Sequence, residues 1–153
     1  MAPPRWFLRL FWIAHAAVFR VSGGRVGVRA PGSRIGALFL LSRGRISGTV
    51  RRNALFYVTD GPDLVVVASN AGDAADPQWW SNLQAGPDVE VELPGRERRP
   101  VRARRATPGE EARLIPRLDA LYREFASYRA RGLREIPIVI LEPRPVEQGP
   151  ARV

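Results

Sequence analysis

Short hydrophobic segments separated by tight turns fill most of the chain, and this feature most strongly constrains its fold. The turns Asp60-Gly61-Pro62-Asp63 and Pro94-Gly95 are of the kind that join neighbouring strands as hairpins. The spacing shows no βαβ units, so the pattern predicts a mainly β fold with flanking helices, largely antiparallel, as a barrel or sandwich. The segments predicted as strands are 25–29, 35–41, 53–59, 64–69, 89–93, 101–104 and 136–141.

An almost uniformly apolar helix is predicted at the N-terminus, ending at Gly23-Gly24. Its apolar part, residues 6–19, would be about 21 Å long, which is short of the roughly 30 Å core of a bilayer. We expect it to pack on the domain; the alternative is that it rests in a membrane interface with Trp6 and Trp12 at headgroup level. The predicted organisation is an apolar helix over 1–24, a barrel domain over 25–143 and a disordered tail over 144–153.

Two further helices should interrupt the sheet. Asp76-Pro77 predicts an N-cap and a first-turn proline for a short helix through Gln84, stopped by Gly86-Pro87. This helix carries Trp79 and Trp80 in succession, so we expect at least one of them to point away from its buried stripe.

The second of these helices begins at a predicted capping box, Thr107-Pro-Gly-Glu110. Pro116 lies inside it, where we expect a kink or a break. Apolar residues at three- and four-residue spacing give it a buried stripe. These are Leu114, Leu118, Leu121, Tyr122 and Phe125.

The composition excludes several kinds of chemistry. The 153 residues contain no cysteine, and all 24 basic residues are arginine. Without thiolates or lysines, and with His15 as the single histidine, the chain has no Cys or multi-His metal site, no Ser-His-Asp triad, no Schiff base and no P-loop lysine. The net charge of +9 favours an anionic small molecule, anionic lipid or nucleic acid as partner. No nucleic-acid-binding motif accompanies it, so we expect no nucleic acid partner.

An arginine-rich turn follows the apolar run 38–41. It contains two glycines and three small hydroxyl residues, and Arg51 and Arg52 come directly after it. Glycines allow successive backbone N–H groups to converge, and such a nest with guanidinium groups around it could hold a phosphate or a carboxylate. The alternative is a hairpin turn that merely carries arginines on its surface.

Several blocks in this order resemble the deazaflavin-dependent nitroreductase family. They are Ser42-Arg-Gly-Arg-Ile-Ser-Gly48, Arg51-Arg-Asn-Ala-Leu-Phe56, Val67-Ala-Ser-Asn70 and Pro77-Gln-Trp-Trp-Ser-Asn-Leu83. An opening block at 22–27 and a closing block at 134–139 extend the resemblance over about residues 8–143. The resemblance implies a split β-barrel related to flavin-reductase and FMN-binding proteins.

The resemblance also implies a cofactor, coenzyme F-420, whose tail carries a phosphate and glutamates, and a hydride transfer to a quinone, nitroaromatic or other conjugated electrophile. Arg45, Ser47, Arg51 and Arg52 would hold the tail. Residues that would line the deazaflavin ring are Asn53, Ala54, Leu55, Phe56, Val67, Ala68, Ser69 and Asn70. Those that would close the pocket are Gln78, Trp79, Trp80, Ser81 and Asn82, while Ser69, Tyr122 and Tyr128 are the candidate proton donors.

The chain departs from the family pattern at three positions of this site. Ile46 stands where the family has a lysine, Ala54 where a proline is common, and Phe125 where a substrate-facing tyrosine is often found. Because phenylalanine has no exchangeable proton, we expect quinone-like acceptors to be reduced better than nitroimidazoles.

Three other functions stay open at this point. They are an FMN-dependent oxidoreductase on the same fold, a non-catalytic deazaflavin-binding protein, and a membrane-surface protein without a redox role. For the favoured function we expect a small-molecule electron acceptor, a cytoplasmic location, and at most peripheral membrane contact through residues 6–19. The oligomeric state is not predicted.

Overall fold

The computed structural model describes residues 35–145. The predicted N-terminal helix, the strand 25–29 and the tail beyond residue 145 lie outside the described residues.

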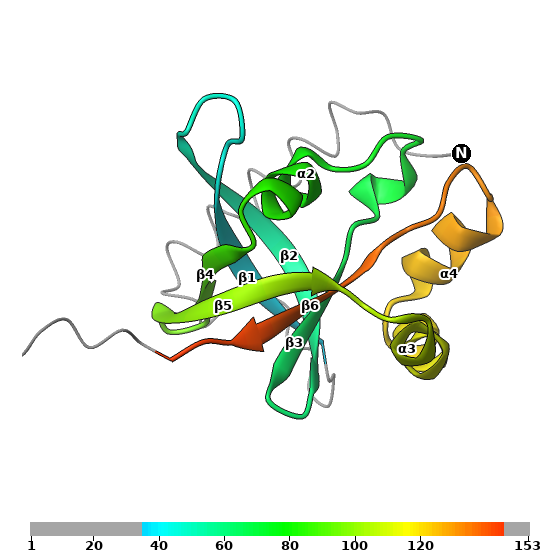
Figure 1. The fold of residues 1–153 in the computed structure, drawn as a ribbon. Helices are drawn as coiled ribbons and strands as arrows, with labels where there is room; N and C mark the ends of the chain where they lie inside the picture. The colour runs from blue at the N-terminus through cyan, green and yellow to red at the C-terminus, as the bar shows by residue number, and fades with distance from the viewer. Residues whose placement is uncertain (1–34, 146–153) are drawn as a thin grey trace, which may run out of the picture.

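Six antiparallel strands close into a barrel, which confirms the predicted fold class (Figure 1). The order around the barrel is β1-β2-β3-β6-β5-β4, and every neighbouring pair is antiparallel. The strands are β1 (Ile35–Arg43), β2 (Val50–Asp60), β3 (Asp63–Val67), β4 (Asp88–Leu93), β5 (Glu97–Arg105) and β6 (Ile138–Pro143). The helices are η1 (Asn70–Gly72), α2 (Gln78–Ala85), α3 (Pro108–Leu121) and α4 (Arg123–Ala130).

The connections between consecutive strands lie at the two ends of the barrel, with the short ones at one end and the long ones at the other. The tight turns β2–β3 and β4–β5, which form hairpins as the sequence predicted, lie at one end. Because consecutive strands run in opposite directions, the β1–β2 turn, the β3–α2–β4 connection and the β5–α3–α4–β6 connection all lie at the other end. Every long connection is therefore at this end of the barrel, which we call the loop end.

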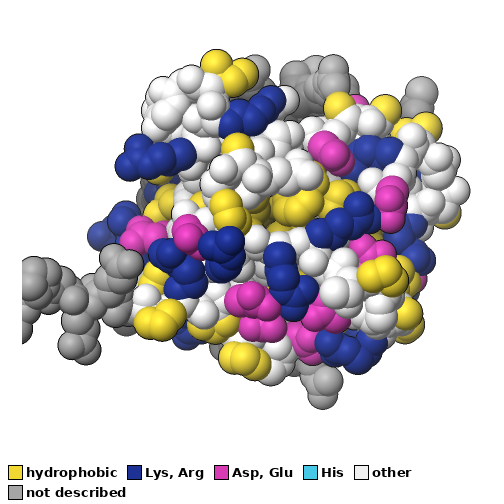
Figure 2. Space-filling model, viewed as in Figure 1, with side chains coloured by type: hydrophobic (Ala, Val, Ile, Leu, Met, Phe, Trp, Pro, Cys, Tyr) yellow, Lys and Arg dark blue, Asp and Glu magenta, His cyan; other side chains and the backbone are white. Residues whose placement is uncertain are grey.

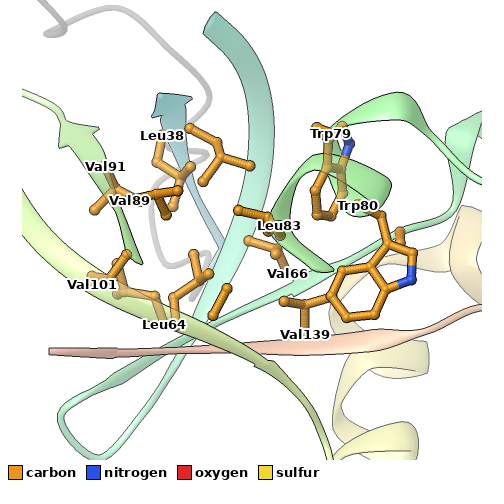
Figure 3. Close-up of a cluster of buried hydrophobic side chains, with 14 of the residues drawn as sticks. Leu38, Leu64, Val66, Trp79, Trp80, Leu83, Val89, Val91, Val101 and Val139 are labelled. Atoms are coloured by element: carbon orange, nitrogen blue, oxygen red, sulfur yellow. The ribbon is translucent and has the colours of Figure 1, made fainter. Parts of the chain in front are cut away.

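The helix α2 packs across the loop end and extends the barrel core. Figure 3 shows Trp79, Trp80 and Leu83 turned toward the barrel side chains, with the Trp80 ring beside Val139. Trp79 and Trp80 are each only 6% exposed, so the expectation that one of them points away is wrong. A helix lying over the mouth of a barrel is covered on more than one stripe, so adjacent residues can both be buried.

Helix boundaries differ from the prediction in two places. Asp76 does not cap α2, whose N-cap is Pro77; its carboxylate pairs with Arg134 instead. The helix α3 starts at the predicted Thr107–Glu110 capping box but continues through Pro116. The break falls at Tyr122, where φ is −129° and ψ is 85°, and α4 follows. Turning the backbone there brings Tyr122 toward the β3–α2 connection.

Most arginines on the β4–β5 hairpin pair with carboxylates on an exposed face of the protein. Arg102 contacts Asp88 at 2.9 Å, and the fork of Arg104 binds both oxygens of Glu110 at 2.7 and 2.8 Å. Beyond the end of β6, the Arg144 N–H donates to the Pro100 carbonyl, so this first residue of the predicted tail is bound to the barrel. Figure 2 shows how arginine and carboxylate side chains alternate over this face.

Candidate functional site

Strand β2 presents the predicted ligand residues to two opposite faces. Arg51 pairs with Ser42, and Leu55 with Leu38, whose side chain lies in the barrel core. Residues at odd positions of β2 thus share the interior face, and Arg52, Ala54 and Phe56 lie on the outer face, since strand side chains alternate. The predicted tail-binding residues Arg51 and Arg52 and the predicted ring-lining residues 53–56 are therefore each divided between two separate rows.

Arg52 is already engaged on the outer face. Its guanidinium lies 3.8 Å from the centre of the Phe39 ring and donates to Glu92 Oε1 at 2.6 Å. Arg51 has no carboxylate partner among residues 35–145, so of the two adjacent arginines it is the better candidate for an anionic ligand.

Several N–H groups of the predicted nest in the arginine turn are already hydrogen-bonded within the protein. Gly44 N–H donates to Thr49 O and Gly48 N–H to Gly44 O, while the Thr49 N–H reaches Ser47 Oγ. The Arg45 N–H donates to Asn82 Oδ1 at 3.1 Å. Any anion held here would therefore be bound mainly by side chains.

The same turn is joined to α2. Arg45 Nη1 donates to Gln78 Oε1 at 2.9 Å and to Asn82 Oδ1 at 3.3 Å. The structure thus brings together Arg45, Gln78 and Asn82, three predicted site residues from two connections. Ile46, at the position of the family lysine, is 89% exposed and contributes no charge.

Unbalanced positive charge is concentrated at this turn. Within the described part of the chain, Arg43, Arg45 and Arg51 have no carboxylate partner, whereas most other arginines do. In Figure 2 the upper lobe shows arginines without neighbouring carboxylates. A phosphate-and-glutamate tail requires such a surplus of guanidinium groups, and this observation fits the cofactor that the sequence suggested.

Three predicted proton donors meet beside this end of the barrel. The Tyr122 hydroxyl lies close enough to the side chains of Ser69 and Tyr128 to interact with both. The Tyr122 ring lies 6.0 Å from Phe56 and 6.5 Å from Tyr128, measured between centroids. Burial is the main reason that the pKa of Tyr122 rises to about 12, and burial also raises the pKa of Tyr128. Both phenols therefore keep their protons at neutral pH.

Other residues predicted to line the ring or close the pocket lie in the core, make local hydrogen bonds or lie on α2. Ala68 is fully buried and its N–H donates to Pro137 O, while Val67 packs in the core beneath α3 and α4. Asn70 is exposed and donates from its side chain to Ala75 O. Ser81 is half-buried on α2, between the two tryptophans and Asn82.

Arg134 organises the segment after β3, and the sequence reasoning missed this role. It appeared only as part of a motif before the last strand. Its partners lie about sixty residues earlier in the chain, at Ala68, Ser69, Asp73 and Asp76. A local sequence pattern carries no signal for contacts of that kind.

Phe125 does not face a ligand. Its side chain is 0% exposed and lies in the core with Leu114, Leu118 and Ile136, with Arg129 stacked 5.3 Å above the ring. The expectation that Phe125 stands at a substrate-facing position of the site is corrected: its side chain fills the core between α4 and the barrel.

We expect Phe125→Tyr to destabilise the protein by about 1–3 kcal/mol, since it buries a hydroxyl without a partner. It should not raise nitroreduction. Urea unfolding of this variant measures the effect, with Phe56→Tyr as control because a hydroxyl on that half-buried ring can reach water. A Phe125→Tyr protein as stable as the parent, with faster nitroreduction, would restore Phe125 to the site.

No helix between residues 35 and 145 is long and apolar enough to cross a membrane.

Comparison with known proteins supports one family. The model of the F420H2-dependent quinone reductase family matches residues 12–143. A Mycobacterium tuberculosis protein, provisionally named as such a reductase, is 42% identical over 118 residues, which cover 77% of this chain and 96% of the relative. A solved F420-H2 dependent reductase superposes with a TM-score of 0.63 at 28% identity, covering 76% of this chain and 100% of its own. A second structure, described as a domain-swapped dimer, has the same TM-score at 27% identity, with 88% of this chain and 99% of its own covered.

Proposed function

The chain belongs to the F420H2-dependent quinone reductase family, and we propose that the loop end of its barrel binds reduced coenzyme F-420 and passes hydride to a quinone. One observation supports this assignment for particular residues: two features lie at the same end of the barrel. These are the unpaired arginines of the β1–β2 turn and the hydroxyl groups of Ser69, Tyr122 and Tyr128.

The arginine turn would bind the tail of the coenzyme. Arg51 and Arg43 offer guanidinium groups without carboxylate partners, and Arg45 could add a third while it stays joined to Gln78 and Asn82. Charge-assisted contacts contribute about 1.5–3 kcal/mol each. The positive charge of these guanidinium groups complements the negative charge of the phosphate and glutamates in the tail.

The ring would lie between the α2 helix and the segment after β3. When bound, the reduced deazaflavin supplies the hydride, so the protein contributes binding, orientation and electrostatics. Trp79 and Trp80 close the barrel mouth with apolar surface that excludes water.

Tyr122 would hold the proton that the reduced acceptor needs. Its pKa of about 12 means that the phenol is protonated throughout the physiological range. Ser69 and Tyr128 contact the same hydroxyl and would orient its proton and replace it after transfer.

The acceptor best supported by the family is a quinone, and nitroaromatic reduction is a secondary possibility for the same site. Bilayer contact through residues 6–19 stays a prediction, which co-sedimentation of the full chain with anionic vesicles would test.

The first experiment is a titration of the purified protein with oxidised coenzyme F-420 and, separately, with FMN. Quenching of the fluorescence of Trp79 and Trp80 reports binding at the barrel mouth. We expect coenzyme F-420 to bind at least tenfold more tightly than FMN, because FMN lacks the glutamates for which the turn offers guanidinium groups. Tighter binding of FMN would favour the alternative of a flavin enzyme on the same fold.

A further inference from the structure

Arg134 uses its whole guanidinium group to hold the segment between β3 and α2. Its Nη2 donates to the Ala68 carbonyl at 2.8 Å and to the Ser69 carbonyl at 3.0 Å. Its Nε donates to the Asp73 carbonyl at 3.0 Å, and its Nη1 pairs with Asp76 at 2.7 Å. The side chain is only 14% exposed. One residue thus holds both ends of the segment 68–76.

The segment that Arg134 holds has an uncommon backbone conformation. Asn70, Ala71 and Gly72 have φ values of 47°, 54° and 79°, so three successive residues are left-handed, and two of them carry a Cβ. Such a conformation persists only where surrounding contacts impose it. The local hydrogen bonds are Gly72 N–H to Ser69 O and Asp73 N–H to Asn70 O.

This left-handed turn packs directly against α4. A Cβ at Gly72 would lie 2.5 Å from the Tyr128 ring, so there is room only for glycine. Immediately before the turn, the Ser69 carbonyl accepts from Arg134, and the Ser69 side chain lies near the Tyr122 hydroxyl. The position of Arg134 is therefore coupled to the position of the Ser69 hydroxyl through one residue.

We propose that Arg134 is a positioning residue, which keeps the left-handed turn in place and so holds Ser69 against Tyr122. Its effect on turnover rests on the proposed function, whereas its effect on the segment 68–76 does not. Lysine cannot replace it, because a single ammonium group lacks the planar fork that reaches carbonyls on both sides.

The first test measures the unliganded protein. In Arg134→Lys, hydrogen–deuterium exchange should be at least tenfold faster in peptides covering residues 68–77 and unchanged in the β2–β3 hairpin. Arg113→Lys is the matched control: its fork binds both Asp60 oxygens, at 2.8 and 2.6 Å, at the opposite end of the barrel. Unchanged exchange over 68–77 in Arg134→Lys would overturn the proposal, whether or not the parent binds coenzyme F-420.

The second test uses turnover with menadione. Arg134→Lys should lower kcat about tenfold or more, as expected for a displaced catalytic group, with less than a threefold change in KM for the reduced coenzyme. Its effect should largely disappear in a Ser69→Ala background, since both changes remove the same support from Tyr122. If the free-energy effects of Arg134→Lys and Ser69→Ala on kcat add fully in the double variant, Arg134 acts only on general stability.

A milder variant covers the case in which Arg134→Lys does not fold. Asp76→Asn removes the carboxylate contact and leaves the contacts of Arg134 with the carbonyls of Ala68, Ser69 and Asp73 in place. It should speed exchange over 68–77 by a smaller factor, about threefold, with the rest of the protein unchanged. No change in this variant would also count against the proposal.

Discussion

Replacing Tyr122 with phenylalanine is expected to lower turnover with menadione about a hundredfold, the lower end of the range for loss of a general acid. The hydroxyl group would be lost from the cluster with Ser69 and Tyr128, whereas the ring would keep its neighbours Phe56 and Phe125. Stability and affinity for the oxidised coenzyme should therefore change little. Steady-state oxidation of the reduced coenzyme measures the effect.

Tyr57→Phe is the matched control for this variant, because Tyr57 is the one tyrosine outside the cluster. Its ring lies over Gly36 on the barrel strands. It should keep parental turnover. Because the raised pKa of Tyr122 favours the neutral phenol, the parental rate should not decline through Tyr122 ionisation as the pH rises from 6 to 9. Equal rates for the Tyr122→Phe variant and the parent would show that solvent supplies the proton.

Arg51→Ala is expected to weaken binding of coenzyme F-420 at least tenfold, which corresponds to the loss of a charge-assisted contact. The neighbouring variant Arg52→Ala should change the affinity less than threefold, since Arg52 lies on the opposite face with Glu92 and Phe39. Binding to the parent should also weaken with salt, as partly exposed ion contacts are screened.

A deazaflavin without the phosphate and glutamates separates tail binding from ring binding. Its affinity should be the same for the parent and for Arg51→Ala. Arg51→Ala could weaken the binding of both ligands equally, or Arg52→Ala could weaken the binding of coenzyme F-420 more than Arg51→Ala does. Either result would show that the tail does not contact the β2 side chains that face the barrel interior.

The fold was predictable because its determinants are local. Hairpin turns such as Asp60–Asp63 bring neighbouring strands together, and alternation of side chains assigns their faces. The same alternation could have separated Arg51 from Arg52, but the resemblance drew attention to consecutive residues. The capping box at Thr107 was likewise local, and the structure confirms it.

The parts of the site that were missed depend on tertiary contacts. The burial of both Trp79 and Trp80 follows from where α2 lies on the barrel, and the full burial of Phe125 follows from the break at Tyr122. The contacts of Arg134 span more than sixty residues of sequence. The resemblance led to the right coenzyme, while the family that matches is named for quinone rather than nitro reduction.

The central claim is that this chain oxidises reduced coenzyme F-420 with a quinone at the loop end of its barrel. Its most direct test is a single-turnover experiment, in which reduced coenzyme F-420 is bound to excess protein and mixed rapidly with menadione. We expect the absorbance of the oxidised deazaflavin to return with a rate that saturates in menadione and is much lower in Tyr122→Phe. If the bound coenzyme is oxidised no faster than the free coenzyme in buffer, the chain binds it without catalysing this reaction.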